Sequence, residues 1–112
     1  MADDRGSPPA SGGPTSLSEL IQYQAGAVVS RTILKRRSGT VTAFAFDEGE
    51  GLSEHTAAFD ALVSMIEGTA EITVAGLAHR IAAGQILQLP AGRPHALKAL
   101  TRFKMLLVMI RE

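Results

Sequence analysis

Two of the three histidines lie in glycine- and proline-rich segments that can hold an imidazole in a defined place. His95 closes the segment Gly84–His95, which has the pattern Gly-x5-Pro-x-Gly-x2-His, and His55 lies six positions after Gly49. Glycine permits a tight turn and proline ends a strand, so we expect each histidine beside a strand end. Imidazole titrates near neutral pH and ligates divalent metals. A convergent pair would therefore suit hydrogen bonding, proton transfer or metal binding.

Other polar residues offer less chemistry. The chain contains no cysteine, which excludes disulfides and thiolate chemistry. Gln88 interrupts the apolar run 86–89 and either reaches into a pocket or faces solvent. The basic run 35–37 precedes Ser38-Gly39 and is expected at a solvated hairpin tip. The formal net charge is zero, so nucleic acid and anionic membrane surfaces are not expected partners.

The elements that must position these residues are strands. Apolar and β-branched segments alternate with glycine, proline and acidic breakers at intervals of about ten residues, which indicates an all-β chain. A short helical turn is expected near residues 17–21, and an acidic turn at 47–51. Strands are expected within residues 27–34, 40–46, 61–66, 70–74, 77–81, 85–89, 96–99 and 103–110.

The third histidine belongs to a predicted hairpin. If residues 75–76 form a two-residue turn, Glu71 lies opposite Arg80. The same register sets Ile72 opposite His79, so His79 is expected to be a packed side chain on an apolar face.

The chain divides into a tail and one domain. Residues 1–16 are rich in proline, glycine and serine, and we expect them to be disordered. Residues 17–112 suffice for one core, and 46% of the chain is hydrophobic. No segment has the ~20 apolar residues that span a bilayer, and no signal peptide is evident, so the cytoplasm is the expected compartment.

The two histidine segments resemble the paired motifs of the cupin superfamily. The first cupin motif reads Gly-x5-His-x-His-x3-Glu-x6-Gly, and Gly49, His55 and Gly68 match it. Ala57 replaces its second histidine and Ala61 its glutamate. Segment Gly84–His95 matches the second motif, although the asparagine expected four residues after His95 is Ala99. The resemblance covers residues 49–99 and implies a single-domain jelly-roll barrel, or double-stranded β-helix, with the motif residues at its mouth.

The resemblance also implies a metal site that this chain retains only in part. Cupins usually hold a divalent metal there, but two ligand positions are now alanines, so we expect no metal or a weakly held Zn, Fe, Mn or Ni at His55 and His95. Asp60 is a further candidate ligand only if a bulge turns it toward the face of Ala61. Ala57 and Ala61 leave a roomier, less polar pocket. Its expected lining is His55, His95, Ala57, Ala61 and Gln88.

Two functions follow from these expectations. The first is a domain that binds a small, partly apolar molecule without metal-dependent catalysis, with His55 and His95 as polar anchors. The alternative is an enzyme of dioxygenase or isomerase/epimerase type, working through a weakly bound metal or by metal-free proton transfer between the histidines. The segment 103–110 is apolar on both faces from Met105 onward, which indicates a second layer or a subunit interface. With the cupin resemblance, it favours a homodimer.

Overall fold

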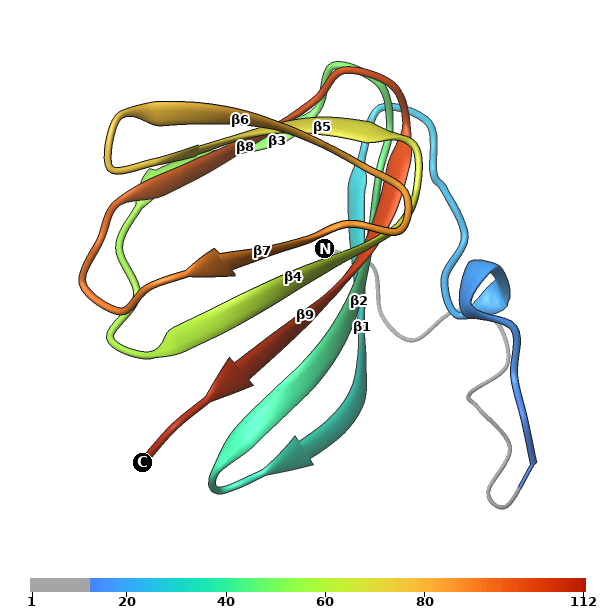
Figure 1. Cartoon of the computed structure of the whole chain (residues 1–112). Helices are drawn as coiled ribbons and strands as arrows, with labels where there is room; N and C mark the ends of the chain where they lie inside the picture. Colours follow the sequence, from blue (N-terminus) through green and yellow to red (C-terminus); the bar gives the residue numbers. More distant parts are fainter. Residues whose placement is uncertain (1–12) are drawn as a thin grey trace.

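The computed structural model describes residues 13–112 and folds them into two facing antiparallel sheets (Figure 1). Their strand orders are β1-β2-β9-β4-β7 and β3-β8-β5-β6. The all-β prediction is confirmed, and one 3₁₀ helix, η1, precedes the strands. The bounds are η1 Leu17–Glu19, β1 Val28–Arg36, β2 Gly39–Phe46, β3 Gly51–His55, β4 Asp60–Glu67, β5 Thr69–Val74, β6 Leu77–Ala82, β7 Ile86–Leu89, β8 His95–Ala99 and β9 Phe103–Ile110.

The main hydrophobic core lies between the two sheets. Alternation along each strand decides which side chains enter it: in β4, Val63 and Met65 are buried, whereas the intervening Ser64 is only half-buried. The rings of Phe46 and Phe103 stack within it, with centroids 4.4 Å apart. The other buried members of this cluster are Ala61, Ala70, Ile72, Ile81, Leu89, Leu97, Ala99 and Met105.

A second apolar cluster covers part of the outer face of the five-stranded sheet. Leu20 and Ile21 pack there against Val29, Ala43 and Ala45. In Figure 1 the segment that carries η1 lies beside this face of β1 and β2. The expected helical turn is therefore present, and it leads into a chain segment that closes one part of the sheet against water.

Buried cations fasten this segment to the sheet. An Nη1 proton of Arg31 is donated to the Leu20 carbonyl at 2.8 Å, and Lys104 Nζ donates to the Ser18 carbonyl at 2.6 Å. Both side chains are almost fully buried, so each hydrogen bond offsets part of the cost of removing a charge from water.

The predicted β5–β6 hairpin is confirmed residue by residue. Glu71 pairs with Arg80 and Ile72 with His79. The turn residues Ala75 and Gly76 both have positive φ, as a tight two-residue hairpin requires. Strand β3 was not among the predicted strands, because its sequence Gly-Leu-Ser-Glu-His contains one apolar residue and no alternation.

Residues 1–12 of the predicted disordered tail lie outside the described residues, and residues 13–16 are exposed. In the part of the chain that the structure describes, no helix is both long and apolar enough to cross a membrane.

Candidate functional site

His95 enters the barrel by ordinary strand alternation. In β8, His95, Leu97 and Ala99 are buried, while Lys98 is exposed. Leu97 and Ala99 belong to the main core, so His95 lies on the same inner face. Only 6% of its surface is exposed.

A bulge brings His55 to the same face. Leu52 pairs with Leu97 and His55 with His95, so three steps along β3 match two steps along β8. Strict alternation would send Leu52 and His55 to opposite faces, because they are an odd number of residues apart. The extra residue restores His55 to the inner side. An irregularity between Leu52 and His55 therefore creates the histidine pair.

The loops that carry the two histidines are tied together by the backbone. The Gly92 N–H donates to the Ala57 carbonyl at 2.9 Å, which joins the loop before His95 to the loop after His55. Gly92 has a φ of +77°, a backbone conformation that residues with a Cβ rarely adopt. The glycine of the second motif is thus required by the backbone that holds the site.

The two rings meet edge to face. Their centroids are 4.3 Å apart and their planes are inclined by 72°. The Nδ1 atom of His55 lies 2.8 Å from the Ser53 carbonyl oxygen, and that of His95 lies 3.3 Å from the Arg93 carbonyl oxygen. Because a carbonyl only accepts, each Nδ1 must carry the proton. In the neutral rings both Nε2 atoms are therefore left as acceptors, bases or metal ligands.

The electrostatics of the pair favour a neutral ring at His95. Burial lowers the pKa of His95 below the ordinary 6.5, and the neighbouring His55 lowers it further, while the hydrogen bond to the Arg93 carbonyl opposes both effects. At pH 7 His95 is accordingly an imidazole with a free lone pair on Nε2.

The remaining predicted site residues are not all beside the pair. Ala61 is buried in the main core, and Ala57 is half-buried in the loop that binds Gly92. Asp60 is exposed, and its Oδ1 accepts the Ala91 N–H at 2.8 Å, so it fastens the start of β4 to the loop after β7. His79 is half-buried and opposite the buried Ile72.

Gln88 is a correction to the predicted pocket lining. It is exposed and alternates with Leu87 and Leu89, which pack in the main core. Its side chain lies instead beside Leu62 in a hollow on the outer face of the five-stranded sheet. Alternation alone dictates this, since β7 is regular and Leu89 is buried.

The donor set does not fit a stable metal site. Cupins usually hold a divalent metal, and zinc and iron sites normally take three or four protein ligands. Among residues 13–112, no group of three or more histidines and carboxylates is arranged to hold an ion. His55 and His95 supply two donors, and the alanines at 57 and 61 supply none.

The described hollows lie outside the histidine pair. Hollows of about 630, 290 and 260 Å³ are found among residues 13–112, and neither His55 nor His95 lines any of these. The roomy interior pocket stays a prediction. The hollow of about 630 Å³, here named the arginine recess, was not foreseen, because its residues come from separate segments. They are Arg36, Arg37, Ser38, Phe59, Arg111 and Glu112.

Comparison with known proteins places this geometry in a family. No family model and no curated protein sequence matches the chain. Among solved structures, the chain is similar to a conserved protein of unknown function from Streptococcus pyogenes, to which it is 33% identical. That match covers 95% of this chain and 93% of the other, with a TM-score of 0.88. A cupin superfamily protein from Desulfitobacterium hafniense matches at 27% identity over 96% of this chain and 99% of that chain, with a TM-score of 0.88.

A cupin 2 conserved barrel domain protein from Leptotrichia buccalis is 34% identical to the chain. That match covers 85% of this chain but 46% of the other, with a TM-score of 0.81. The two-sheet barrel, the paired motif histidines and these similarities agree. The predicted jelly-roll fold is therefore confirmed, and the chain belongs to the cupin superfamily.

Proposed function

We propose that this chain is a small-molecule-binding domain in which His55 and His95 are the polar anchors. The supporting observation is the pair of Nδ1 contacts to backbone carbonyls, which leaves Nε2 of each ring, when neutral, as a hydrogen-bond acceptor. The core side chains next to His95 in β8 are apolar. A ligand of matching chemistry carries hydroxyl, amide or protonated acid donors on a partly apolar body.

A binding screen tests this proposal. Small hydroxyl- and amide-bearing molecules are added to the protein, and ligands are identified by a rise in unfolding temperature. Affinity for each ligand should fall about tenfold or more in His55→Ala and in His95→Asn, because neither variant has an acceptor at the position of Nε2. His79→Ala is the matched control and should bind as the unchanged protein does. Ligands whose affinity depends on neither His55 nor His95 would remove the basis of the proposal.

Weak metal binding is part of the same proposal. Two imidazoles leave most of a coordination sphere to water, so any Zn, Fe, Mn or Ni should exchange readily. Protein purified without chelator should carry metal well below one ion per chain by elemental analysis. One tightly held ion per chain would overturn this expectation and favour the metal-dependent alternative.

Metal-free proton transfer is the second candidate, favoured by the lowered pKa of His95. Its neutral Nε2 can take a proton from a carbon next to a carbonyl, while the electron pair moves to the carbonyl oxygen. The proton returns to that carbon from the His95 imidazolium, directly or after transfer to the neighbouring His55 Nε2, and gives the carbonyl compound or, from the opposite face, its epimer. Carbonyl ligands from the screen, incubated in deuterium oxide, should then exchange that hydrogen. Exchange that persists at full rate in both His55→Ala and His95→Asn would exclude the pair as the base.

We also propose that the chain forms a homodimer. On the outer face of β9, Leu106 packs against the cluster that contains Leu20 and Ile21. Farther along the same strand, Ile110 is 62% exposed. Ile86 on the edge strand β7 is 64% exposed. A second copy can continue the cover that the N-terminal segment begins. Light scattering should give twice the chain mass, and Ile110→Lys should shift it toward the monomer. A monomer at every concentration would exclude this assembly.

A further inference from the structure

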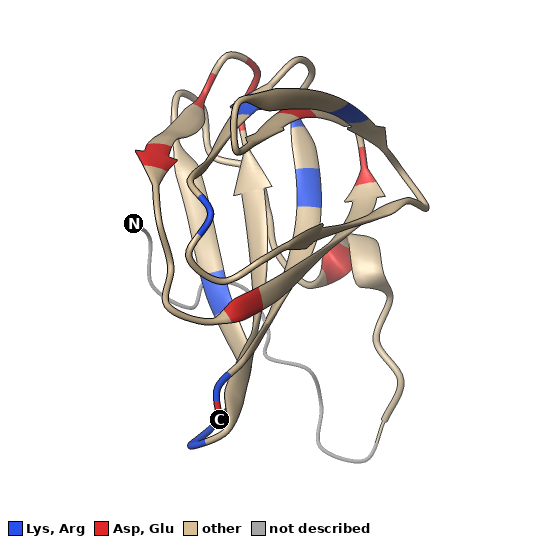
Figure 2. Ribbon diagram, turned by 60° about the vertical axis from the view of Figure 1, so that its left-hand side comes forward, with Lys and Arg blue, Asp and Glu red and all other residues tan. Residues whose placement is uncertain are grey.

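The arginine recess brings together three segments that are far apart in the sequence. Arg36, Arg37 and Ser38 come from the end of β1 and the β1–β2 turn, and Phe59 immediately precedes β4. Figure 2 shows Lys and Arg segments at the tip of this hairpin, beside the C-terminal end. The recess measures about 630 Å³. This volume lies within the range of small-molecule sites, about 300–1,000 Å³.

The walls of the recess are held by backbone pairing. The Arg111 N–H donates to the Ser38 carbonyl at 2.6 Å, which joins the C-terminal segment to the hairpin tip. On the other side, Asp60 at the start of β4 pairs with Ile110, so the residues next to Phe59 and Arg111 run side by side. The guanidinium carbon of Arg111 lies 5.9 Å from the centre of the Phe59 ring.

The positive charges of the recess are not neutralised by neighbouring acids. Within residues 13–112, no carboxylate forms an ion pair with Arg36, Arg37 or Arg111. One Arg36 nitrogen donates to the Lys35 carbonyl, which leaves its other donors for another acceptor. Glu112 is the one acidic side chain of the lining. Three guanidinium groups against one acidic side chain leave the side chains of the recess with an excess of positive charge and of hydrogen-bond donors.

We propose that the arginine recess binds a small organic anion, with its oxyanion on the guanidinium groups and a planar apolar body against Phe59. Guanidinium is a planar donor that matches the oxygen atoms of carboxylate and phosphate in pairs. The Phe59 ring supplies the apolar surface, and Arg111 near that ring can contact the oxyanion of a molecule placed on it. The site uses neither motif histidine and is distinct from the proposed histidine function.

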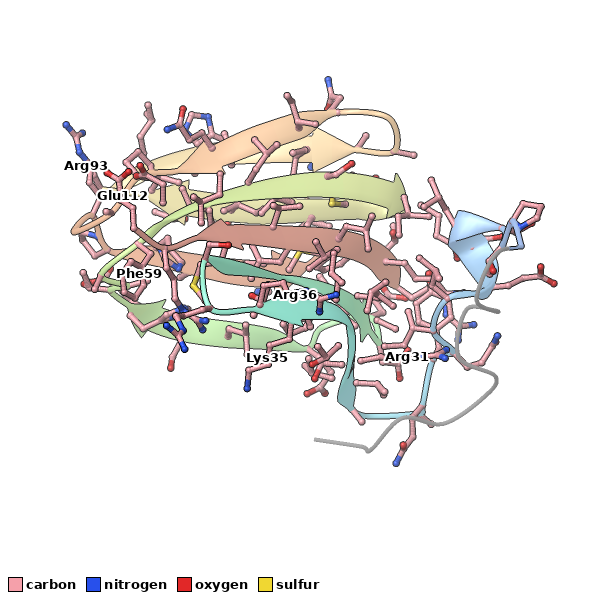
Figure 3. All side chains as sticks on the ribbon, turned by 90° about the horizontal axis from the view of Figure 1, so that it is seen from below. Arg31, Lys35, Arg36, Phe59, Arg93 and Glu112 are labelled. Atoms are coloured by element: carbon pink, nitrogen blue, oxygen red, sulfur yellow. The ribbon has the colours of Figure 1, made fainter. Side chains whose placement is uncertain are left out.

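The recess nevertheless lies toward the histidine end of the barrel. Phe59 is four residues after His55, so their Cα atoms are separated by no more than about 14 Å. Figure 3 shows Phe59, Arg93 and Glu112 at one end of the molecule, and Arg93 is two residues before His95. A long anion held in the recess could therefore extend toward the imidazoles, but binding in the recess does not require them.

Benzoate is the first probe, because it combines one carboxylate with one aromatic ring. Titrated into the full chain at low ionic strength, it should shift the backbone amide NMR signals of the hairpin tip, Phe59 and the C-terminal segment. Benzamide has the same shape without the charge and should bind at least tenfold more weakly. Added salt should weaken benzoate binding, because the recess is exposed. Inorganic phosphate and cyclohexanecarboxylate test the oxyanion and the ring separately.

Single substitutions assign the contacts. Arg37→Ala and Arg111→Ala should each weaken benzoate binding about tenfold, since each removes charged donors. Arg80→Ala, an exposed arginine on β6, is the matched control and should leave the affinity unchanged. Phe59→Leu should weaken benzoate more than cyclohexanecarboxylate, because it removes the aromatic face. Glu112→Gln should strengthen binding, because it removes the one acidic side chain of the lining.

Three results would overturn the proposal: no detectable binding of benzoate or phosphate, equal binding of benzoate and benzamide, or unchanged affinity in both arginine variants. Thermal unfolding of each variant shows whether it is folded. Arg37 and Glu112 are exposed, and Phe59 and Arg111 are half-buried. His55→Ala and His95→Asn should bind benzoate as the unchanged protein does. That outcome separates the recess from the histidine site, so either proposal can fail alone.

Discussion

At one end of the barrel Phe46 and Phe103 stack with their ring centroids 4.4 Å apart, whereas toward the other end His55 and His95 meet edge to face at 4.3 Å. The first pair is wholly buried; in the second, His95 is 6% exposed and His55 is open to solvent. Strand β8 separates them: His95 begins it and Ala99 ends it, about 13 Å away. We name these the closed end and the open end.

This difference indicates that the closed end contributes mainly to stability and that the open end carries the groups available for chemistry. Phenylalanines need no hydrogen bonds, so the closed end can exclude water completely. Imidazoles must be satisfied, and backbone carbonyls bind one nitrogen of each ring while the other stays available. Substitutions at the closed end should therefore change the free energy of unfolding, and those at the open end should change titration and binding.

The largest effect is expected for Phe103→Ala at the closed end. Removing a fully buried ring costs about 3–5 kcal/mol of unfolding free energy, through lost transfer energy and the cavity left behind. Phe59→Ala is the matched variant at the open end, where the ring is half-buried, and should cost much less. Urea unfolding of both variants measures the difference. Equal losses would contradict the division between the two ends.

Gly68→Ala should cause the next largest loss of unfolding free energy. Gly68 has a φ of +81°, and a Cβ there would overlap the Arg102 carbonyl oxygen and the backbone of Phe103. We expect a loss of about 2 kcal/mol or more from strain and overlap together. Gly76→Ala is the control: its φ is +83°, but a Cβ would meet nothing within 4 Å. If both variants lost the same free energy of unfolding in urea, the close approach of residue 68 to β9 would add no cost of its own.

Acid should destabilise the chain through the open end. The pKa of His95 in the folded chain lies below the ordinary 6.5, so the unfolded chain binds a proton at a higher pH than the folded chain. The contribution of His95 is fully present above pH 6.5 and is lost as the pH falls from there through the folded pKa. Urea midpoints measured between about pH 7.5 and 5 should fall, and less so in His95→Asn.

The variant His55→Ala separates the two causes that lower the pKa of His95. Burial is the larger cause and the charge of His55 the smaller, so His55→Ala should raise the pKa of His95 toward 6.5 without reaching it. The ring C–H signals of His95, followed by NMR against pH, give the value directly. A pKa that does not move would mean that the two rings do not interact in solution.

The sequence predicts the closed end better than the open end. Runs of apolar residues predict β4 and β9, which reach the closed end. The Ala75-Gly76 turn fixes the register of β5 on β6, although this turn lies at the open end, where Val74 pairs with His95. Strand β3 escapes the same reasoning, because Ser53 and Glu54 break its pattern. Yet the bulge there sets the position of His55. The carbonyl oxygens that fix both imidazoles belong to the backbone, which has no sequence signature.

Contacts between distant segments were also beyond sequence reasoning. The pairing of the two histidines was expected only through resemblance to cupins, because spacing alone does not reveal which strands become neighbours. The sequence does not determine whether Gln88 faces a pocket or solvent. The burial of Leu89 in the core shows that Gln88, one residue away, faces solvent. The recess around Phe59 needs Arg111 to lie beside the hairpin tip, which requires the register of β9 against β2.

The smallest change in unfolding free energy is expected for substitutions of Asp60 at the open end. These substitutions distinguish a structural contact to the backbone from a role as metal ligand. Its Oδ1 accepts the Ala91 N–H, so Asp60→Ala should cost about 1 kcal/mol in urea unfolding. Asp60→Asn keeps an oxygen acceptor in the same place and should cost little. A metal ligand would behave differently, because the amide loses the carboxylate charge that binds a cation. A marked loss of metal affinity in Asp60→Asn with unchanged stability would therefore assign Asp60 to a metal site, whereas loss of stability in Asp60→Ala alone assigns it to the backbone that supports His95.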